Sequence, residues 1–513
     1  MNKFLTSAAG LAAAGTVGYF AVGNVLGSAV AMAAAGLILH AKFSAPKNEQ
    51  FGDTVRGTQV DNKTKRRRAP SDQVALGGIA IPRECEPQNF LVVGAPGSGK
   101  TVAWLSIMDV ARARGQRAIV YDPTGEFVAH YYRAGQDVIL SPIDTRSALW
   151  SPWAEGRTPF DYENLAQALI PDGTGNEQFW TQAARAIFQA ALASTNNLPE
   201  LIELIFAAEQ DDLLAAIQAQ GLGGLTGPPN MLASTRGVAA TYIRSLAYLP
   251  APGPAPFSIR DWVKDEKDSW LFVSSREDCR KSIRPLISMW LGLAVQSAMS
   301  LSPDRNRRLW MILDELPTLQ KLPALDIALA GGRKYGITVL VGIQAISQTR
   351  EIYGRDAAAS ILSHPSTRLT LRVGDSETAE FLSKSLGDRH TIRKVSSESN
   401  TGGSGSTSEQ HSIEAAVLPS EILALPNLVG YLRVPNDPVI KKIKLVPRDR
   451  PTLAVPYADR SLATPPAMPP GSSATAIPSA PGVVRGPSVP GADAPDVSDE
   501  DLPDKLVGEG DAP

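Results

Sequence analysis

The chain has 513 residues, of which 20% are charged and 43% hydrophobic, and its formal net charge is −2. This length fits two or three domains. The two cysteines, Cys85 and Cys279, lie far apart without metal-type spacing, which excludes a disulfide framework and indicates a reducing compartment.

A membrane anchor is predicted at the N-terminus, in residues 1–41. Residues 4–39 contain no charged side chain and are rich in Ala, Gly, Val and Leu. This apolar run is too long for the core of a signal peptide, and it fits either two tightly connected spans or one tilted span. Gly23 and Asn24 in its middle favour the two-span hairpin.

Basic residues follow the anchor, in a juxtamembrane linker that we assign to residues 42–76. Lys42, Lys47 and the basic block at residues 63–68 place the rest of the chain in the cytoplasm by the positive-inside rule. The block is interpreted as a solvated charge run, and contact with anionic lipid or DNA is the alternative.

The first part of a nucleotide-binding domain is expected in residues 77–149. After a small β-element at 77–82, residues 89–101 read NFLVVGAPGSGKT, and residues with helical apolar periodicity follow. Glycines at this spacing let backbone N–H groups approach a polyphosphate, while the lysine neutralises charge and the threonine hydroxyl reaches Mg²⁺. The predicted phosphate-binding residues are Gly94, Ala95, Pro96, Gly97, Ser98, Gly99, Lys100 and Thr101, of which Thr101 is also a Mg²⁺ ligand.

Two more strands are predicted in this part, at residues 118–121 and 137–140. The alternation of strands and helices is typical of a parallel, doubly wound sheet, so the predicted fold class is α/β. Asp122 and Glu126 follow the first of these strands, at an edge where side chains face the ligand crevice. A turn acid and a helix cap are the favoured interpretation, and positioning of nucleotide or of a neighbouring subunit is the alternative.

An all-α insertion is expected in residues 150–257. The strand signal is lost there, and segments with helical periodicity and Ala-rich faces alternate with Gly and Pro breaks. An insertion between the strands of a nucleotide-binding fold indicates a surface for a substrate or partner.

The second part of the nucleotide-binding domain is expected in residues 258–450. After a strand at 270–274 and a helix at 283–298, an apolar strand ends in two adjacent carboxylates, Asp314 and Glu315. Such a strand lies beside the phosphate loop in motor proteins, so Asp314 is predicted to hold Mg²⁺ through water and Glu315 to polarise the attacking water.

Polar residues follow the next strand signals as well. The strand at 337–342 ends near Gln344, which is either a sensor of the terminal phosphate or an ordinary strand-end side chain. A polar helix and a strand near residues 369–373 come next, and Arg368 and Arg372 accompany that strand.

The end of the chain changes character twice. Residues 396–412 are rich in Ser, Gly and Thr and predict a mobile loop, after which residues 417–432 predict a helix and a last strand. Residues 451–513 are rich in Pro, Ala, Gly and Ser and are predicted to be disordered. Their acidic end is either a docking peptide or a solubilising tail.

Together these blocks resemble the type IV secretion coupling proteins of the TrwB/TraD type, within the HerA/FtsK-like P-loop ATPases. The resemblance rests on the anchor and on GAPGSGKT, DPTGEF, LWMILDELPTLQKLPAL, GGRKYGITVLVGIQ and PSEILALPNLVGYL, and it covers residues 77–432. It implies a RecA-like, hexameric, DNA-dependent ATPase at the bacterial inner membrane, with its ATPase domains in the cytoplasm. Such a protein recruits a relaxase–DNA complex and passes single-stranded DNA to the channel of the secretion system.

The resemblance also implies roles for single residues. ATP and Mg²⁺ are the expected ligands, Lys100 and Glu315 carry catalysis, and Gln344 is the sensor. An arginine finger that acts on the neighbouring subunit is expected at Arg368 or Arg372, and spacing does not choose between them.

The sequence leaves open which residues contact DNA and which of several related functions the chain has. Arg333 and Lys334 are candidates for phosphate contacts in a central pore, and a helix-end charge pair is the favoured alternative. The rival functions are a coupling protein that delivers protein effectors and a membrane-anchored DNA translocase for chromosome segregation. The Pro-rich, acidic end argues against the C-terminal winged-helix DNA reader that such a translocase carries.

Overall fold

The computed structural model describes residues 53–461, apart from residues 65–68, 174, 176, 226–230 and 398–405. The predicted anchor lies outside these residues, as do most of the basic block and the tail from residue 462 onward. Within the described residues, no helix is long and apolar enough to cross a membrane.

A ten-stranded mixed sheet runs through the described part of the molecule, in the order β2-β15-β14-β11-β5-β10-β9-β6-β8-β7. The strands from β11 to β7 are parallel, and β14 (Val429–Arg433) runs against both of its neighbours. The parallel part therefore confirms the predicted α/β class. Its members are β11 (Thr367–Thr370), β5 (Phe90–Val93), β10 (Ile337–Ile343), β9 (Leu309–Leu313), β6 (Arg117–Asp122), β8 (Trp270–Ser274) and β7 (Val138–Leu140).

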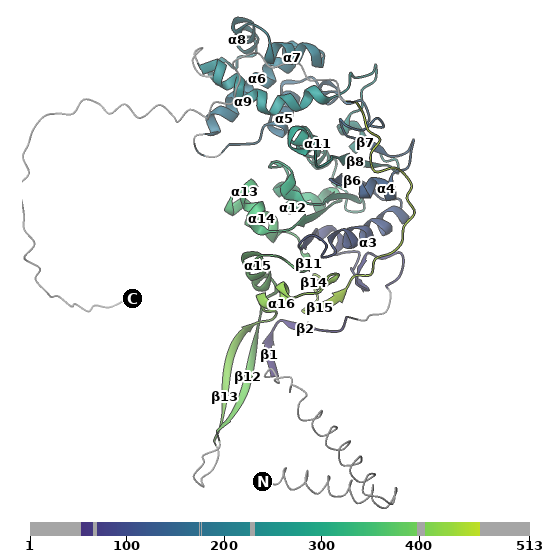
Figure 1. Cartoon of the computed structure of the whole chain (residues 1–513), viewed down its shortest axis with the longest axis vertical. Coiled ribbons are helices and arrows are strands. Elements are labelled where there is room, and N and C mark those ends of the chain that lie inside the picture. The colour runs from purple at the N-terminus through teal and green to yellow at the C-terminus, as the bar shows by residue number, and fades with distance from the viewer. Residues whose placement is uncertain are drawn as a thin grey trace, which may run out of the picture.

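The central strands are buried on both faces, which explains their continuous apolar runs. In β9, Met311 and Leu313 belong to one hydrophobic core, whereas Trp310 and Ile312 belong to the other. Helices on both sides of the sheet complete a three-layer arrangement (Figure 1). One layer holds α3 (Lys100–Ala113) and α4 (Glu126–Tyr131), and the other holds α11 (Arg280–Met299), α12 (Leu325–Gly331), α13 (Ile346–Tyr353), α14 (Arg355–Ser363) and α15 (Ser376–Leu386).

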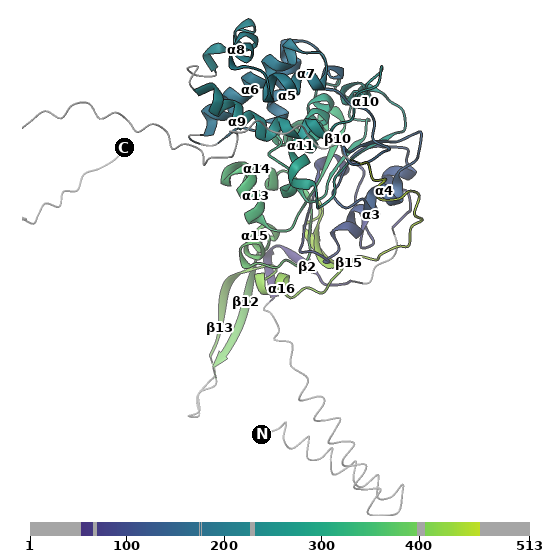
Figure 2. The same cartoon turned by 45° about the horizontal axis from the view of Figure 1, so that its top comes forward.

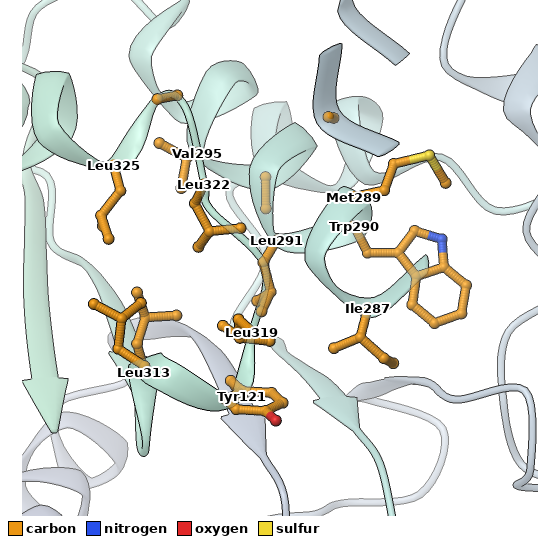
Figure 3. Packing of buried hydrophobic residues seen from close by; sticks show 14 of the residues in the cluster. Tyr121, Ile287, Met289, Trp290, Leu291, Val295, Leu313, Leu319, Leu322 and Leu325 are labelled. Carbon is orange, nitrogen blue, oxygen red and sulfur yellow. The ribbon is translucent and has the colours of Figure 1, made fainter. Parts of the chain in front are cut away.

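Helix α11 is the central helix of the larger core. Figure 3 shows Leu291 and Val295 of this helix in one cluster with Leu319, Leu322 and Leu325, which follow β9 in the chain. The segment directly after the carboxylate pair is therefore anchored in the core, and this anchoring restricts the end of β9.

The insertion follows β7 and precedes β8 in the chain, and these two strands pair directly with each other. At its base, the Phe257 N–H donates to the Leu149 carbonyl at 2.8 Å, and Trp150 forms a bridge with Phe257. The described residues of the insertion form helices that lie at one end of the molecule, next to α11 (Figure 2). They are α5 (Pro159–Leu169), α6 (Glu177–Ser194), α7 (Leu198–Phe206), α8 (Gln210–Ala219) and α9 (Leu232–Ile243).

The far edge of the sheet differs from the sequence expectation. Residues 53–61 lie within the range expected to be a linker, but they form β1 (Asp53–Gly57) and β2 (Gln59–Asp61). Strand β2 pairs in parallel with β15 (Val439–Lys444), and β1 pairs with β12. These short strands lack a local signal because their pairing partners lie far away in the sequence.

A long hairpin replaces the predicted mobile loop at residues 396–412. Strands β12 (Asp388–Ser397) and β13 (Ser406–Ala415) pair antiparallel and project from the body of the molecule (Figure 1). Within it, the hydroxyl groups of Thr391 and Ser412 lie 2.8 Å apart across the two strands. The loop prediction is wrong for the described residues of this range. A polar composition taken alone predicts a loop, but pairing between the two strands stabilises these residues as a hairpin.

A C-terminal strap, residues 451–461, lies on the body of the molecule. The Leu453 N–H donates to the Ala129 carbonyl at 2.8 Å, and the Arg460 N–H donates to the Ile143 carbonyl at 2.9 Å. Between them, the Tyr457 hydroxyl donates to the Ser275 carbonyl at 2.8 Å. The predicted disorder is therefore wrong for these residues, because the folded domain supplies the partners that a Pro-rich chain cannot supply itself.

Candidate active site

The phosphate loop lies between β5 and α3, and its backbone requires its glycines. Gly97 and Gly99 have φ angles of 72° and 117°, in the region that favours glycine. A Cβ on Gly94 would clash with the Ser98 hydroxyl. Helix α3 begins at Lys100 without a side-chain cap, so the N–H groups of its first turn are available to a phosphate group.

Two of the predicted residues, Lys100 and Gln344, contact the carboxylate of a third, Glu315. The Lys100 Nζ lies 3.3 Å from Glu315 Oε2, and the Gln344 Nε2 donates to that same oxygen at 2.7 Å. Lys100 also donates to the Gly94 carbonyl at 2.8 Å. The three side chains come together because β10 lies between β5 and β9, so all three strands end at the same edge.

Glu315 has an unusual backbone for a residue with a side chain. Its φ and ψ are 64° and 57°, in the left-handed region, where a non-glycine residue costs about 1–2 kcal/mol. Thr318 holds this geometry, since its N–H and its hydroxyl both donate to the Glu315 carbonyl at 3.0 and 2.8 Å. Tyr121 supports Thr318 in turn, with its hydroxyl 2.8 Å from the Thr318 Oγ1. Backbone strain that is held in place in this way is typical of active sites.

Asp314 is the buried carboxylate that precedes Glu315 at the end of β9. Burial raises the pKa of Asp314 to about 6, although the hydrogen bond from Trp104 and the Lys100 charge favour its ionised form. That bond joins the Trp104 Nε1 to Asp314 Oδ1 at 3.0 Å. Gly342 packs against the same oxygen, and a Cβ there would lie 3.0 Å from it.

The residues present fit a Mg²⁺ ion that is bound together with a polyphosphate. Mg²⁺ takes one or two protein oxygens and fills its remaining positions with water and phosphate oxygens. The Thr101 hydroxyl on the first turn of α3 and the Asp314 carboxylate supply such oxygens. Among the described residues, no group of three or more His, Cys, Asp or Glu side chains offers a separate metal site.

Asp122 has a structural role, as the favoured interpretation expected. Its Oδ1 accepts from the Gly125 N–H at 2.8 Å, and its Oδ2 accepts from the Val128 N–H at 2.8 Å, which caps α4. Burial raises the pKa of Asp122 to about 6, although these backbone hydrogen bonds favour the carboxylate. Glu126 is exposed at the start of α4.

The family model of the "Type IV secretion-system coupling protein DNA-binding domain" matches residues 73–446. This range contains the phosphate loop, the carboxylate pair and Gln344. The chain belongs to the type IV secretion-system coupling proteins.

Relatives of this coupling-protein chain are similar over most of its length. It is 32% identical to the coupling protein TraD of Escherichia coli (strain K12) over 440 residues, which cover 81% of this chain and 61% of TraD. The chain thus spans about three fifths of that relative's length. An unbound structure of the bacterial conjugative coupling protein TrwBdeltaN70 has a TM-score of 0.73 and 29% identity, and the match covers 80% of this chain and 98% of that one. Plasmid coupling protein TrwB in complex with ADP and Mg²⁺ has a TM-score of 0.72 at 29% identity, with 80% and 99% covered.

The two candidate finger arginines have different surroundings. The Arg368 guanidinium donates to the carbonyls of Pro365 and Ser363 at 2.9 and 2.7 Å, and burial lowers its pKa. Arg372 lies beside the phosphate loop, where its carbonyl accepts from the Ala95 N–H at 2.7 Å and its Nη2 donates to Asn427 Oδ1 at 2.9 Å. Only Arg372 of the two is therefore joined to the phosphate loop by a hydrogen bond in the described structure.

Arg333 and Lys334 lie apart from this site. They belong to the short helix η7 (Gly332–Tyr335), which precedes β10, whereas the phosphate loop follows β5 at the opposite edge of the sheet. Both side chains are exposed.

Sequence reasoning missed several contributors to the site. Trp104 looked like an ordinary apolar residue of α3, and no signal distinguished it. Thr318 likewise lacked a local signal, whereas Gly342 lies in the GGRKYGITVLVGIQ block that carries the family resemblance. Leu428, within the PSEILALPNLVGYL block, has a φ of 66° and donates its N–H to the Ser98 carbonyl at 2.8 Å. The block is part of the family resemblance, and this contact shows that it supports the phosphate loop.

Proposed function

We propose that this chain is the coupling ATPase of a conjugative type IV secretion system and that it uses ATP hydrolysis to drive single-stranded DNA toward the transport channel. The observation that carries the proposal is the meeting of Lys100 and Gln344 on Glu315, next to Asp314 and the phosphate loop. The family match supports it, as do the solved complexes of TrwB with ADP and Mg²⁺ and with the ATP analogue ADPNP.

The residues of the site have distinct roles in this proposal. Lys100 and the N–H groups of the loop bind the phosphates of ATP. Thr101 and Asp314 hold Mg²⁺, which neutralises charge on the phosphates when it is bound. Glu315 orients the attacking water and accepts its proton, and Gln344 holds the Glu315 carboxylate in place through the bond at 2.7 Å.

Location and partners follow from the same proposal. The N-terminal anchor holds the protein in the bacterial inner membrane, and the nucleotide-binding domain lies in the cytoplasm. Six copies form a ring, the helical insertion faces the incoming relaxase–DNA complex, and DNA contacts go to phosphates without sequence preference. The secretion channel receives the transported strand.

The experiment that tests the proposal is steady-state ATP hydrolysis by the full chain in detergent, with and without single-stranded DNA, across a salt series. We expect DNA to stimulate turnover and the stimulation to fade with salt, because phosphate contacts release counterions. Lys100→Ala and Glu315→Gln are the controls, and loss of the general base lowers turnover by at least about 10²-fold. Absence of wild-type turnover would contradict the proposal. If DNA leaves the ATP turnover of assembled rings unchanged, the result would instead favour a protein that delivers protein effectors.

A further inference from the structure

Trp104 joins the helix of the phosphate loop to the carboxylate at the end of β9. It lies on α3 one turn beyond Thr101, and its side chain is fully buried. Its single polar group, the indole N–H, donates to Asp314 Oδ1 at 3.0 Å. We propose that Trp104 is a positioning residue that sets the orientation of the Mg²⁺-binding carboxylate of Asp314. The inference rests on the proposed function, because that function assigns Asp314 to Mg²⁺.

The indole bond distinguishes the two oxygens of Asp314. Among the described residues, the bond from Trp104 is the hydrogen bond that reaches this carboxylate, and it engages Oδ1. The second oxygen is left for the metal or its water. Groups that hydrogen-bond a metal ligand in this way fix its orientation, and their loss typically costs 10–100-fold in metal affinity or activity.

Packing prevents the indole from turning away. A Cβ on Gly342 would lie 3.3 Å from the Trp104 Cζ2 and 3.0 Å from Asp314 Oδ1, so the backbone of β10 lies close to both partners of the bond and leaves them little room to move. Trp104 also belongs to the core that α3 and α4 cover. Its ring therefore holds the carboxylate from a fixed base, which is what a positioning role requires.

A purely structural role makes a different prediction, and Trp310 offers the matched control. Trp310 is fully buried in the same core, and it lies on β9, the strand that Asp314 directly follows. Its indole N–H donates to Gln116 Oε1 at 2.8 Å, away from the carboxylate pair. Replacing either tryptophan removes a buried indole from this core, but only Trp104 contacts the Mg²⁺ ligand.

The test is equilibrium binding of a fluorescent ADP, in Mg²⁺ and in EDTA, to the full-length wild type, Trp104→Phe and Trp310→Phe. The measured quantity is the factor by which Mg²⁺ tightens binding. We expect Trp104→Phe to reduce this factor by about 10–100-fold while its affinity in EDTA stays at the wild-type value. Trp310→Phe is expected to keep the wild-type factor. An unchanged factor in Trp104→Phe, or an equal loss of affinity in EDTA, would overturn the proposal.

A second variant covers the case in which Trp104→Phe fails to fold. Benzothienylalanine at position 104 keeps the size of the ring but replaces the N–H with sulfur, so it removes the bond while retaining the packing. The same loss of the Mg²⁺ factor is expected, and its absence would contradict the positioning role alone. If Mg²⁺ does not change the affinity of the wild type for ADP, both the proposed function and this inference are contradicted.

Discussion

At the scale of single residues, the site gathers charges that are costly to bury alone. Lys100 and Glu315 have side chains that are 9% and 13% exposed, and each offsets the charge of the other at 3.3 Å. Asp314 adds a second carboxylate nearby, so the three groups together carry an excess of negative charge. A divalent cation with a bound polyphosphate suits such a site, because the cation pairs with the carboxylate and Lys100 pairs with the phosphates.

The pH dependence of stability should report the buried Asp314. Its folded pKa of about 6 exceeds the value of about 3.9 for an exposed aspartate, so its contribution to stability is present below about pH 4 and is lost as the pH rises through 6. Uncharged Asp314→Asn should therefore be more stable than wild type at pH 8, by up to about 3 kcal/mol, and this advantage should shrink as the pH falls from 6 toward 4. Thermal unfolding of wild type and Asp314→Asn at pH 4.5 and at pH 8, in EDTA without nucleotide, measures the stability difference at each pH. An advantage that is equal at the two values would show that Asp314 does not titrate in this range.

Gly342→Ala should impair catalysis although it replaces no charged residue. The new Cβ would lie 3.0 Å from Asp314 Oδ1 and 3.3 Å from the Glu315 N–H nitrogen, so the carboxylate pair has to shift. These contacts require a shift of only a few tenths of an ångström. Because a misplacement of about 1 Å costs about 10²-fold in rate, we expect this smaller shift to lower ATP turnover by about 3-fold. Gly237→Ala on α9 is the control, because its Cβ meets nothing within 4 Å, and it should keep wild-type turnover. Equal turnover in both variants would mean that the site tolerates the shift.

At the scale of elements, strands with a local sequence signal were predicted better than strands that depend on pairing with a distant segment of the chain. Strands β8 and β10 were predicted nearly to the residue, because each is a continuous apolar run of sufficient length. Strand β2 was missed, since its pairing of Val60 with Ile440 depends on a chain segment that returns from far away. Composition misled at β12 and β13, where Ser and Thr predict a loop but also suit paired strands.

The strap at residues 451–461 should stabilise the nucleotide-binding domain. Tyr457 and Pro456 pack on Gly125 in the turn that begins α4, and Asp459 pairs with Arg276 at 2.6 Å. A chain that ends at Arg450 loses these contacts and several backbone hydrogen bonds, each worth about 1 kcal/mol, so its melting temperature should fall by at least about 2 °C. A chain that ends at Ser461 keeps all of them and should melt like the wild type. If both truncated chains melt alike, the strap contributes nothing to stability.

At the scale of the whole molecule, the position of the site was more predictable than its support. Gly94, Asp314 and Gln344 each follow a strand of a parallel sheet, and such strand ends share one edge, which explains why they lie together. The groups that hold them were not predictable, because Trp104 is one apolar residue in a helical pattern and Thr318 is one hydroxyl in a loop. Their roles arise only when β9, β10 and α3 pack together.

The proposed ring requires contacts between copies of the chain. An arginine that acts on the site of the neighbouring subunit tests for such contacts. We expect Arg372→Ala to lose at least about 10³-fold in turnover, whereas Arg368→Ala, whose guanidinium bonds to carbonyls of its own chain, keeps most of it. Lys100→Ala is expected to be inactive for a separate reason, the loss of the phosphate-binding lysine. Mixing it with Arg372→Ala should restore activity, because about a quarter of the head-to-tail interfaces then join an intact Lys100 to an intact Arg372. No recovery on mixing would mean that Arg372 acts within its own subunit, and full activity of both single arginine variants would place the finger elsewhere in the chain.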